Sequence, residues 1–398
     1  MIIKEDWGSH PQHFWLLGRR PERVVEFDER LGTWNVFGYP EAITALSDPR
    51  RFSSEIKRIY PPGYEDPFDD GNILQMDPPA HRKLRNLVSH GFTPKIVADL
   101  QPRIAALTSE LLDEVAGRDE FELVEALAQP LPVIVIAELL GVPASDRELF
   151  RNWVDDLFSN TEQVSLNEVE AGAMAEAAEQ AHAKLLPMVT YLGEHAAERR
   201  GQPREDLLSK LVHATVDGER LTDREIVNFA MLLLVAGHIT TTLLLGNTML
   251  CLDAHPDAAA RVRADRSLVP GAIEESLRLV SPFPGVARVS TTEVELGGVT
   301  VPANQLIMVW GGAANRDDRQ FTDPQVFRPD RDPNPHLGLG RGIHFCLGAP
   351  LARLEGRVAL NILFDRFPAL RADPATPPVF RPSPDMSGVK TLPLRTSV

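Results

Sequence analysis

Cysteine is scarce in this sequence, with only Cys251 and Cys346 among its 398 residues. The two lie far apart and in dissimilar contexts, so we do not expect the disulfide framework that stabilises many small secreted proteins. Cys251 lies between Leu250 and Leu252, which fits a buried structural thiol. Cys346 has glycine-rich surroundings and needs a separate interpretation.

Long apolar runs are also missing. No stretch offers eighteen uninterrupted apolar residues, and the start of the chain carries acidic residues where a signal peptide has basic ones. We therefore expect a cytoplasmic protein without a membrane partner. Positive charge is in deficit as well, because the formal net charge is −15. This charge argues against nucleic acid as a partner, although it leaves room for a local basic patch.

Internal repeats, low-complexity segments and linkers are absent too, and 43% of the residues are hydrophobic, which is enough for a large core. We expect one domain over residues 1–398. The fold class should be mainly α with small β-sheets, because helical spacing dominates and strand-like pairs flank Asp28–Gly32 and Gly297–Gly298. Helices are expected at 94–117, 146–159, 166–199, 204–214 and 222–253.

The surroundings of Cys346 are typical of a ligand-binding loop. In "HLGLGRGIHFCLGAPLAR", residues 336–353, four glycines allow the backbone to fold closely around the cysteine. Helical spacing then runs from Leu347 to Phe364, with Pro350 in the first turn. A cysteine at a helix N-terminus has its thiolate stabilised by the helix dipole and by free backbone amides. The alternative is a buried structural cysteine in a glycine-rich turn.

This loop resembles the haem-binding loop of the cytochrome P-450 family, the haem-thiolate monooxygenases, whose pattern is F-x-x-G-x-x-x-C-x-G. The resemblance implies the P-450 fold, with a long central helix over haem b, and Cys346 as the axial iron ligand. Gly340 and Gly348 are expected in the cofactor-binding loop. A thiolate ligand favours O–O cleavage, which is why a cysteine is needed there. Leu339 departs from the family's phenylalanine, so electron donation by the sulfur should differ.

Further motifs of the same family follow in the right order. In "EESLR", Glu275 and Arg278 are one helical turn apart, which alone is typical of a solvated ion pair. The resemblance implies a buried network of both residues with Arg331 of "FRPDR", which supports the cysteine loop. Arg328 stands where the family commonly has aspartate.

A cationic group is expected around the cofactor's propionates. His81 and Arg85, in "DPPAHRKLRNLVSHGFTP", are four residues apart on one helix face and can bind one anionic group. By resemblance they bind a haem propionate together with Arg288 of "GVARVS" and His344. Taken alone, His81 and Arg85 also fit a basic surface helix.

The apolar stretch "LLLVAGHITTTLLLG", residues 232–246, contains a polar interruption. Its central residues resemble the family's A/G-G-x-D/E-T-T/S segment on the long central helix, and the catalytic positions implied are Ala236, Gly237, Ile239, Thr240 and Thr241. Thr240 matches the oxygen-activating threonine. Its hydroxyl can bond the carbonyl four residues back, which would loosen the helix and leave a pocket that the two small residues keep open. A plain packing helix is the alternative, and polar residues such as His238 argue against a transmembrane one.

Ile239 replaces the acid that normally helps to deliver protons during oxygen activation. General acid–base participation typically contributes about 10²–10⁴ in rate, so another route should exist. Three explanations stay open: a relay through Thr240, Thr241, His238 or water, a hydroxyl supplied by the substrate, or an enzyme that does not need this route. We favour a relay by water or substrate because Thr240 is retained.

The substrate pocket is expected to be apolar. It should be lined by Leu232 and Val235, by the segment 283–287 with Phe283 and Val286, and by the Pro- and Gly-rich loop 58–72. A medium-sized hydrophobic molecule such as a secondary metabolite suits such a pocket. A steroid or fatty acid, a terpenoid and a polyketide-like compound all fit it.

Electrons are expected from a separate ferredoxin-type donor with its reductase, because the chain ends soon after the cysteine helix. A local basic patch for this donor is predicted at Arg82, Lys83, Arg353 and Arg357. The function predicted is a monooxygenase that hydroxylates or epoxidises a hydrophobic small molecule with O2. The alternatives are a peroxide-driven peroxygenase and a haem protein that binds a ligand without turnover.

Overall fold

The computed structural model of the protein describes residues 3–60, 69–146, 148–150, 152–153, 171–216 and 218–396. The helices within these ranges are α1 (Tyr39–Ser47), α2 (Ala80–Ser89), α3 (Pro94–Asp99), α4 (Gln101–Asp113), α5 (Pro130–Leu140), α7 (Ala171–Gly201), α8 (Leu207–His213), α9 (Asp223–Asp253), α10 (Pro256–Ala264), α11 (Val269–Leu279), α12 (Gly311–Ala314) and α13 (Ala349–Arg366). Most of the helix expected at 146–159 and of the loop expected at 58–72 lies outside the described residues.

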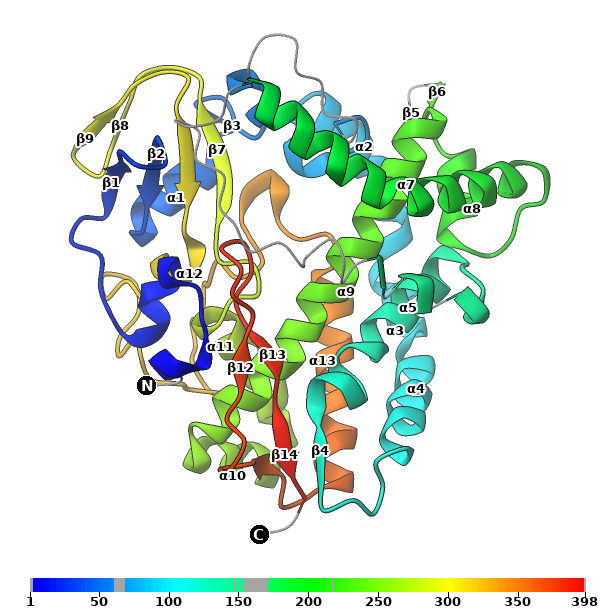
Figure 1. Ribbon diagram of the computed structural model, residues 1–398, viewed down its shortest axis with the longest axis vertical. Coiled ribbons are helices and arrows are strands. Elements are labelled where there is room, and N and C mark those ends of the chain that lie inside the picture. The colour runs from blue at the N-terminus through cyan, green and yellow to red at the C-terminus, as the bar shows by residue number, and fades with distance from the viewer. Residues whose placement is uncertain are drawn as a thin grey trace.

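Helix α9 forms the centre of the helical part of the molecule (Figure 1). It packs against α5, α7, α11 and α13. Its start matches the predicted range because Thr222 and Glu225 form a capping box, in which each side chain accepts the other residue's backbone N–H. Twenty-one of its residues are buried, and most belong to a core cluster that extends from Ile3 to Leu394.

Within the described ranges, α9 is the one helix long and apolar enough to cross a membrane. The window that meets this criterion is 67% buried inside the protein. Its length and composition therefore suit a helix of the protein core.

The strands lie mainly on the opposite side of the molecule from α7 and α8 (Figure 1). They are β1 (Val25–Asp28), β2 (Thr33–Val36), β3 (Phe52–Ser53), β4 (Glu120–Glu122), β5 (Thr215–Val216), β6 (Glu219–Arg220), β7 (Val286–Ser290), β8 (Val294–Leu296), β9 (Val299–Val301), β10 (Leu306–Val309), β11 (Arg371–Ala372), β12 (Val379–Phe380), β13 (Val389–Thr391) and β14 (Pro393–Arg395). The largest sheet has the order β1-β2-β10-β7-β3, and its β2–β10 pair is parallel. A second sheet has the order β11-β14-β4.

Both predicted hairpins are present. Strands β1 and β2 pair antiparallel across the Asp28–Gly32 turn. Strands β8 and β9 are joined by Gly297 and Gly298, whose φ angles of +60° and +81° favour glycine. The large sheet places Arg288 on β7, where it becomes part of the candidate site.

The helix expected at 94–117 is divided in two. Thr93 caps α3 by accepting the N–H of Ile96 at 3.4 Å, as a threonine before proline predicts. A new helix, α4, begins at Gln101 and has Pro102 in its first turn. Proline has no N–H to donate, and its ring would clash with the carbonyl four residues earlier in a continuous helix. The first helix therefore ends, and a new one begins with proline in its first turn.

Candidate functional site

Cys346 lies just before the N-terminus of α13. Its N–H donates to the carbonyl of Leu339 at 2.9 Å, which closes the glycine-rich loop. Burial raises the pKa of the Cys346 thiol, while N–H groups of Gly348 and Ala349 donate to the sulfur and oppose that rise. The charges of two neighbouring arginines act in the same direction as these donors. The pKa remains raised without a ligand, and these donors and charges are the groups that would stabilise a thiolate bound to a metal ion.

The glycines of this loop differ in backbone conformation and in the space around them. Gly340 and Gly342 have φ angles of +72° and +70°, which favour glycine, and a Cβ at Gly342 would lie 2.6 Å from the carbonyl oxygen of Leu46. Gly348 has nothing within 4 Å of the position of a Cβ. The side of the loop next to Cys346 is therefore open.

The predicted cationic residues come together beside this loop. The rings of His81, on α2, and His344 have centroids 4.4 Å apart. Arg85 Nη2 donates to the carbonyl of Phe345 at 2.6 Å, and Arg288 Nη1 donates to the carbonyl of Ala287 at 2.7 Å. The structure also brings in a residue that sequence analysis missed, because His344 Nε2 and Ser54 Oγ lie 2.8 Å apart.

The basic groups of this cluster form no ion pair with a described residue, although the charge of Asp77 acts on both His81 and Arg288. Burial lowers the pKa of Arg288 to about 10, and burial together with the charges of Arg288, His81 and Arg85 lowers the pKa of His344 to about 3. Nε2 of His81 is buried without a hydrogen bond, and Arg288 makes no ion pair with any described residue. Leaving such groups buried is costly unless a ligand completes their hydrogen bonds and charges.

These observations fit the haem that the sequence resemblance implies. An anionic ligand with carboxylates would satisfy His81 and Arg288, while Cys346 would supply one thiolate to the iron. Among the described residues there is no group of three or more His, Cys, Asp or Glu side chains that could hold a bare metal ion. A single thiolate is enough where a macrocycle already holds the metal.

One face of α9 is left partly open. Ala236 is exposed, Leu232, Val235 and Thr240 are half-buried, and Thr240 Oγ1 donates to the carbonyl of Ala236 at 2.6 Å. The helix nevertheless continues from Asp223 to Asp253, so the expected loosening is not seen.

Gly237 also faces the neighbouring helix. A Cβ at Gly237 would lie 3.1 Å from a side-chain carbon of Ile136 on α5. The close approach of α5 and α9 therefore gives a second reason for the glycine, beside the pocket that the sequence suggested, since Gly237 is only half-buried.

Ile239 and Thr240 have different surroundings although they are consecutive. Ile239 is 1% exposed and packs with Leu243 and Met386 in a small apolar cluster. Thr241 is also buried, and Thr242 Oγ1 donates to the carbonyl of His238 at 3.1 Å. Of the three consecutive threonines, only Thr240 lies on the open face.

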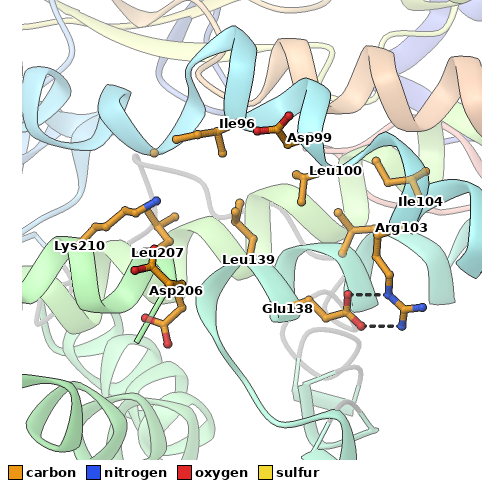
Figure 2. Close-up of a pocket in the computed structure, with 13 residues that line it drawn as sticks. Ile96, Asp99, Leu100, Arg103, Ile104, Glu138, Leu139, Asp206, Leu207 and Lys210 are labelled. Carbon is orange, nitrogen blue, oxygen red and sulfur yellow. Dashed lines mark hydrogen bonds and ion pairs between the residues drawn. The ribbon is translucent and has the colours of Figure 1, made fainter. Parts of the chain in front are cut away.

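The predicted substrate residues on the other side of the site are partly accessible. Phe283 is 43% exposed and Val286 is half-buried. A cavity of about 350 Å³ lies elsewhere, between α3, α4, α5 and α8 (Figure 2). None of the four predicted substrate residues lines it. Figure 2 also shows that Glu138 on α5 binds Arg103 on α4 through two hydrogen bonds of 3.0 and 2.9 Å.

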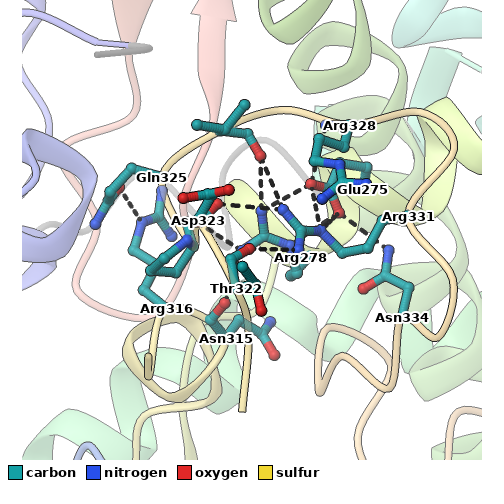
Figure 3. Close-up of polar contacts among 12 residues, drawn as sticks. Glu275, Arg278, Asn315, Arg316, Thr322, Asp323, Gln325, Arg328, Arg331 and Asn334 are labelled. Atoms are coloured by element: carbon teal, nitrogen blue, oxygen red, sulfur yellow. Dashed lines mark hydrogen bonds and ion pairs between the residues drawn. The ribbon is translucent and has the colours of Figure 1, made fainter. Parts of the chain in front are cut away.

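The predicted network around Glu275 is present (Figure 3). Glu275 and Arg278 are completely buried and form hydrogen bonds of 2.7 and 2.8 Å, and Arg331 Nε donates to Glu275 Oε1 at 2.9 Å. Arg328 contributes only its backbone N–H, at 3.1 Å from Glu275. The side chain at position 328 is therefore free to differ from aspartate. Asn334 Nδ2 also donates to Glu275, so the network connects α11 with residues 322–334.

The neighbouring Glu274 was missed by sequence analysis. Arg353 donates to its two carboxylate oxygens at 2.7 Å each, and His336 Nε2 lies 3.0 Å from one of them. Burial alone would raise the pKa of Glu274, but hydrogen bonds from Arg353 and His336 lower it to about 2. The doublet of glutamates in "EESLR" is the sequence signal that could have drawn attention to it.

The predicted basic patch is therefore smaller than the sequence suggested. Arg353 is paired with Glu274, and Lys83 forms an ion pair with Glu219. Arg357 Nη2 donates to Gln101 at 3.2 Å, and both Arg357 and Arg82 are exposed. Only Arg82 and Arg357 remain without an acidic partner among the described residues.

Comparison with known proteins agrees with this geometry. Residues 35–397 match the family model for Cytochrome P450. Cyclomarin C epoxidase CymV of Salinispora arenicola is 44% identical over 386 residues, which cover 97% of this chain and 96% of the relative. Erythromycin C-12 hydroxylase of Saccharopolyspora erythraea is 43% identical over 362 residues, which cover 90% of this chain and 87% of the relative.

Solved structures are similar over nearly the whole chain. The post-tailoring hydroxylase HmtN involved in himastatin biosynthesis is 56% identical, with a TM-score of 0.87 and coverage of 99% of both chains. A cytochrome P450-like monooxygenase involved in microbial secondary metabolism is 52% identical, with a TM-score of 0.93 and coverage of 98% of this chain and 99% of that one.

Proposed function

Because this chain belongs to the cytochrome P450 family, it is a haem b monooxygenase with a cysteine thiolate ligand, and we propose that it oxidises a natural product. The observation that carries the proposal is that Cys346 precedes the N-terminus of α13 in a glycine-rich loop, beside a cluster that contains the unsatisfied Nε2 of His81 and the buried guanidinium of Arg288. Haem b, when bound, supplies the redox chemistry that activates oxygen.

Residues of the chain have separate tasks in holding the cofactor. Cys346 would supply the thiolate ligand to the iron, and the N–H groups of Gly348 and Ala349, which donate to the sulfur, would stabilise its negative charge. The side chains that hold the propionates are His81, Arg85, Arg288 and His344. The orphaned Nε2 of His81 supports this assignment because it lies buried with no other partner. Gly340 and Gly348 let the loop approach the cofactor closely.

Thr240 holds the water molecule or substrate hydroxyl that delivers the protons. Its hydroxyl lies on the open face of α9 and donates to the carbonyl of Ala236, so its lone pairs are available to a water molecule or a substrate hydroxyl. Ile239 carries no proton, and it is buried with Met386. His238 and Thr241 are buried as well. The relay therefore runs through Thr240 with water or the substrate, and not through the helix interior.

The substrate is a medium-sized hydrophobic natural product. Leu232 and Val235 from α9, with Phe283 and Val286 from the other side, supply an apolar lining, and large apolar surfaces bind such molecules well. The relatives support the substrate class, since their names refer to cyclomarin C, erythromycin and himastatin. Both hydroxylation and epoxidation occur among them.

Electrons come from a separate ferredoxin-type protein with its reductase, in the cytoplasm. The acceptor surface is the exposed part of α2 and α13 near Cys346, where Arg82 and Arg357 are available to an acidic donor.

The test uses the haem-loaded protein and a library of hydrophobic natural products. Compounds that change the haem absorption are incubated with ¹⁸O2, ferredoxin, reductase and reduced nicotinamide, and products are analysed by mass spectrometry. One ¹⁸O atom per product molecule is expected. A binding response without product under any condition would contradict the proposal.

A peroxide-driven reaction is the second candidate, because the position of the usual acid is the buried Ile239. The same compounds are therefore incubated with hydrogen peroxide alone. Turnover that needs only peroxide, and fails with O2 and the electron donors, would favour the peroxygenase.

A further inference from the structure

Glu274 connects both ends of the cysteine loop. On the entering side, the N–H of Gly338 donates to His336 Nδ1 at 3.1 Å, so His336 Nε2 carries the proton that it donates to Glu274. On the leaving side, Arg353 binds the same carboxylate from α13. Leu339 follows His336 by three residues, and its carbonyl accepts the N–H of Cys346. One side chain of α11 therefore contacts the two segments that flank the sulfur.

Arg353 also lies in the electrostatic environment of Cys346. Ala349, whose N–H points to the sulfur, and Arg353 are four residues apart and share one face of α13. The charge of Arg353 acts on Cys346, and the charge of Cys346 acts on Arg353. The carboxylate of Glu274 offsets this positive charge, because it binds both nitrogen donors of the guanidinium that face it.

We propose that Glu274 is a positioning residue that sets the net charge next to the Cys346 sulfur, by pairing with Arg353 and holding His336 at the entrance of the loop. The proposal rests on the proposed function, since Cys346 must be the iron ligand. It assigns to Glu274 a task different from that of Glu275, which is completely buried and binds the segment 322–334.

The pair has an electrostatic consequence with a definite sign. With both Glu274 and Arg353 present, the summed charge of the two side chains is close to zero. Removal of Glu274 leaves an unbalanced positive charge, which favours the reduced iron, whereas removal of Arg353 leaves a negative charge, which favours the oxidised iron. Both side chains are partly exposed, at 27% and 40%, so solvent screens part of the effect.

The experiment measures the ferric–ferrous midpoint potential of the haem-loaded protein and of three variants. Glu274→Gln should raise the equilibrium constant for reduction by roughly threefold to tenfold, where tenfold corresponds to about 59 mV for one electron. Arg353→Gln should lower it by a similar factor. The double variant Glu274→Gln/Arg353→Gln should return close to the parent protein.

Glu138→Gln is the matched control. Glu138 also binds an arginine through two hydrogen bonds, but it lies on α5 beside the cavity of Figure 2, which no residue of the cysteine loop lines. Its potential should equal that of the parent protein. Arg353→Lys keeps the charge without the paired hydrogen bonds, and its potential should also stay close to the parent value.

The absorption spectrum of the ferrous, carbon monoxide-bound protein shows whether thiolate ligation is intact. It therefore distinguishes failure of this proposal from failure of the proposed function. Equal potentials, or shifts of the same sign, in Glu274→Gln and Arg353→Gln with intact thiolate ligation would overturn the proposal. Loss of thiolate ligation in every variant would overturn it too, because the pair would then only hold the loop together. A parent protein without thiolate ligation would instead contradict the proposed function.

Discussion

Thr240 shows how exposure distinguishes one residue of a regular helix from neighbours of the same type. Thr240 and Thr242 both donate to the carbonyl four residues back, at 2.6 and 3.1 Å. Only Thr240 is on the open face, since Thr242 is 1% exposed. The hydrogen-bond pattern alone therefore does not distinguish Thr240 from Thr242, whereas the greater exposure of Thr240 does.

Replacement of Thr240 tests this assignment. Thr240→Ala removes the hydroxyl that would hold water or substrate, and we expect product formed per reductant consumed to fall at least about tenfold. Thr242→Ala is the control, because it removes an equivalent hydroxyl from the buried side of α9. Reductant consumption and product are measured together in the reconstituted system. Equal coupling in the two variants would show that exposure of the hydroxyl is unimportant.

Replacement of Ile239 by an acid tests the missing relay. In Ile239→Glu the new carboxyl would lie against Leu243 and Met386, so burial should raise its pKa and destabilise the protein by a few kcal/mol. The loss should increase with pH, because the unfolded state ionises first. We also expect altered coupling of reductant to product.

Thermal unfolding at several pH values and the coupling assay check this prediction. Ile239→Leu conserves volume and should cost less than about 1.5 kcal/mol. An Ile239→Glu protein with the stability and the coupling of the parent would contradict both parts.

At this scale the sequence predicts chemical types well and partners poorly. Cys346, His81 and Arg288 could be recognised because each lies in a contiguous motif. Arg353 could not be assigned correctly, because its partner Glu274 lies 79 positions away and only the folded chain brings them together. A single sequence does not show which charged side chains pair with each other in the folded protein.

Helix α13 has a property that no motif predicted. Glu355 is buried, makes no hydrogen bond through Oε2, and burial raises its pKa to about 8. The carboxyl is therefore neutral in the folded protein at neutral pH. Below about pH 4.5 both the folded and the unfolded states are protonated, and between that value and pH 8 only the unfolded state loses the proton. The contribution of Glu355 to stability therefore falls as pH rises through this window.

Glu355→Gln should remove this pH dependence. Each unit of pKa difference corresponds to about 1.4 kcal/mol, so the variant should gain stability relative to the parent between pH 5 and pH 8. Glu114→Gln, at an exposed position at the end of α4, is the control and should show no such gain. Chemical unfolding of both variants at the two pH values gives the comparison. A constant difference between Glu355→Gln and the parent would contradict the assignment.

Element boundaries were predictable where local signals were strong. The capping box at Thr222 made the start of α9 accurate to one residue, and paired glycines located the β8–β9 turn. The division between α3 and α4 was missed, because the apolar periodicity continues across Pro102 and outweighed the missing N–H of that residue.

For the whole molecule, the negative net charge gives special weight to the two cations of the predicted patch that have no acidic partner among the described residues. The formal net charge is −15, so the molecule as a whole repels an acidic electron donor. The structure removes Lys83 and Arg353 from the predicted docking patch by pairing them with glutamates. The proposed docking of an acidic donor would therefore depend on Arg82 and Arg357, which no single motif distinguishes from other arginines.

Charge reversal tests this docking surface. Arg82→Glu and Arg357→Glu should slow reduction by a ferredoxin at low ionic strength, and the difference from the parent should shrink as salt screens the charges. Arg118→Glu makes the same change in net charge, but it lies in the turn between α4 and β4, at the opposite end of the molecule from α2 (Figure 1). Stopped-flow reduction of the three variants distinguishes a local patch from a general charge effect. Equal slowing by Arg118→Glu would show that the donor responds to net charge alone, because only a localised site can discriminate between two ends of the same acidic molecule.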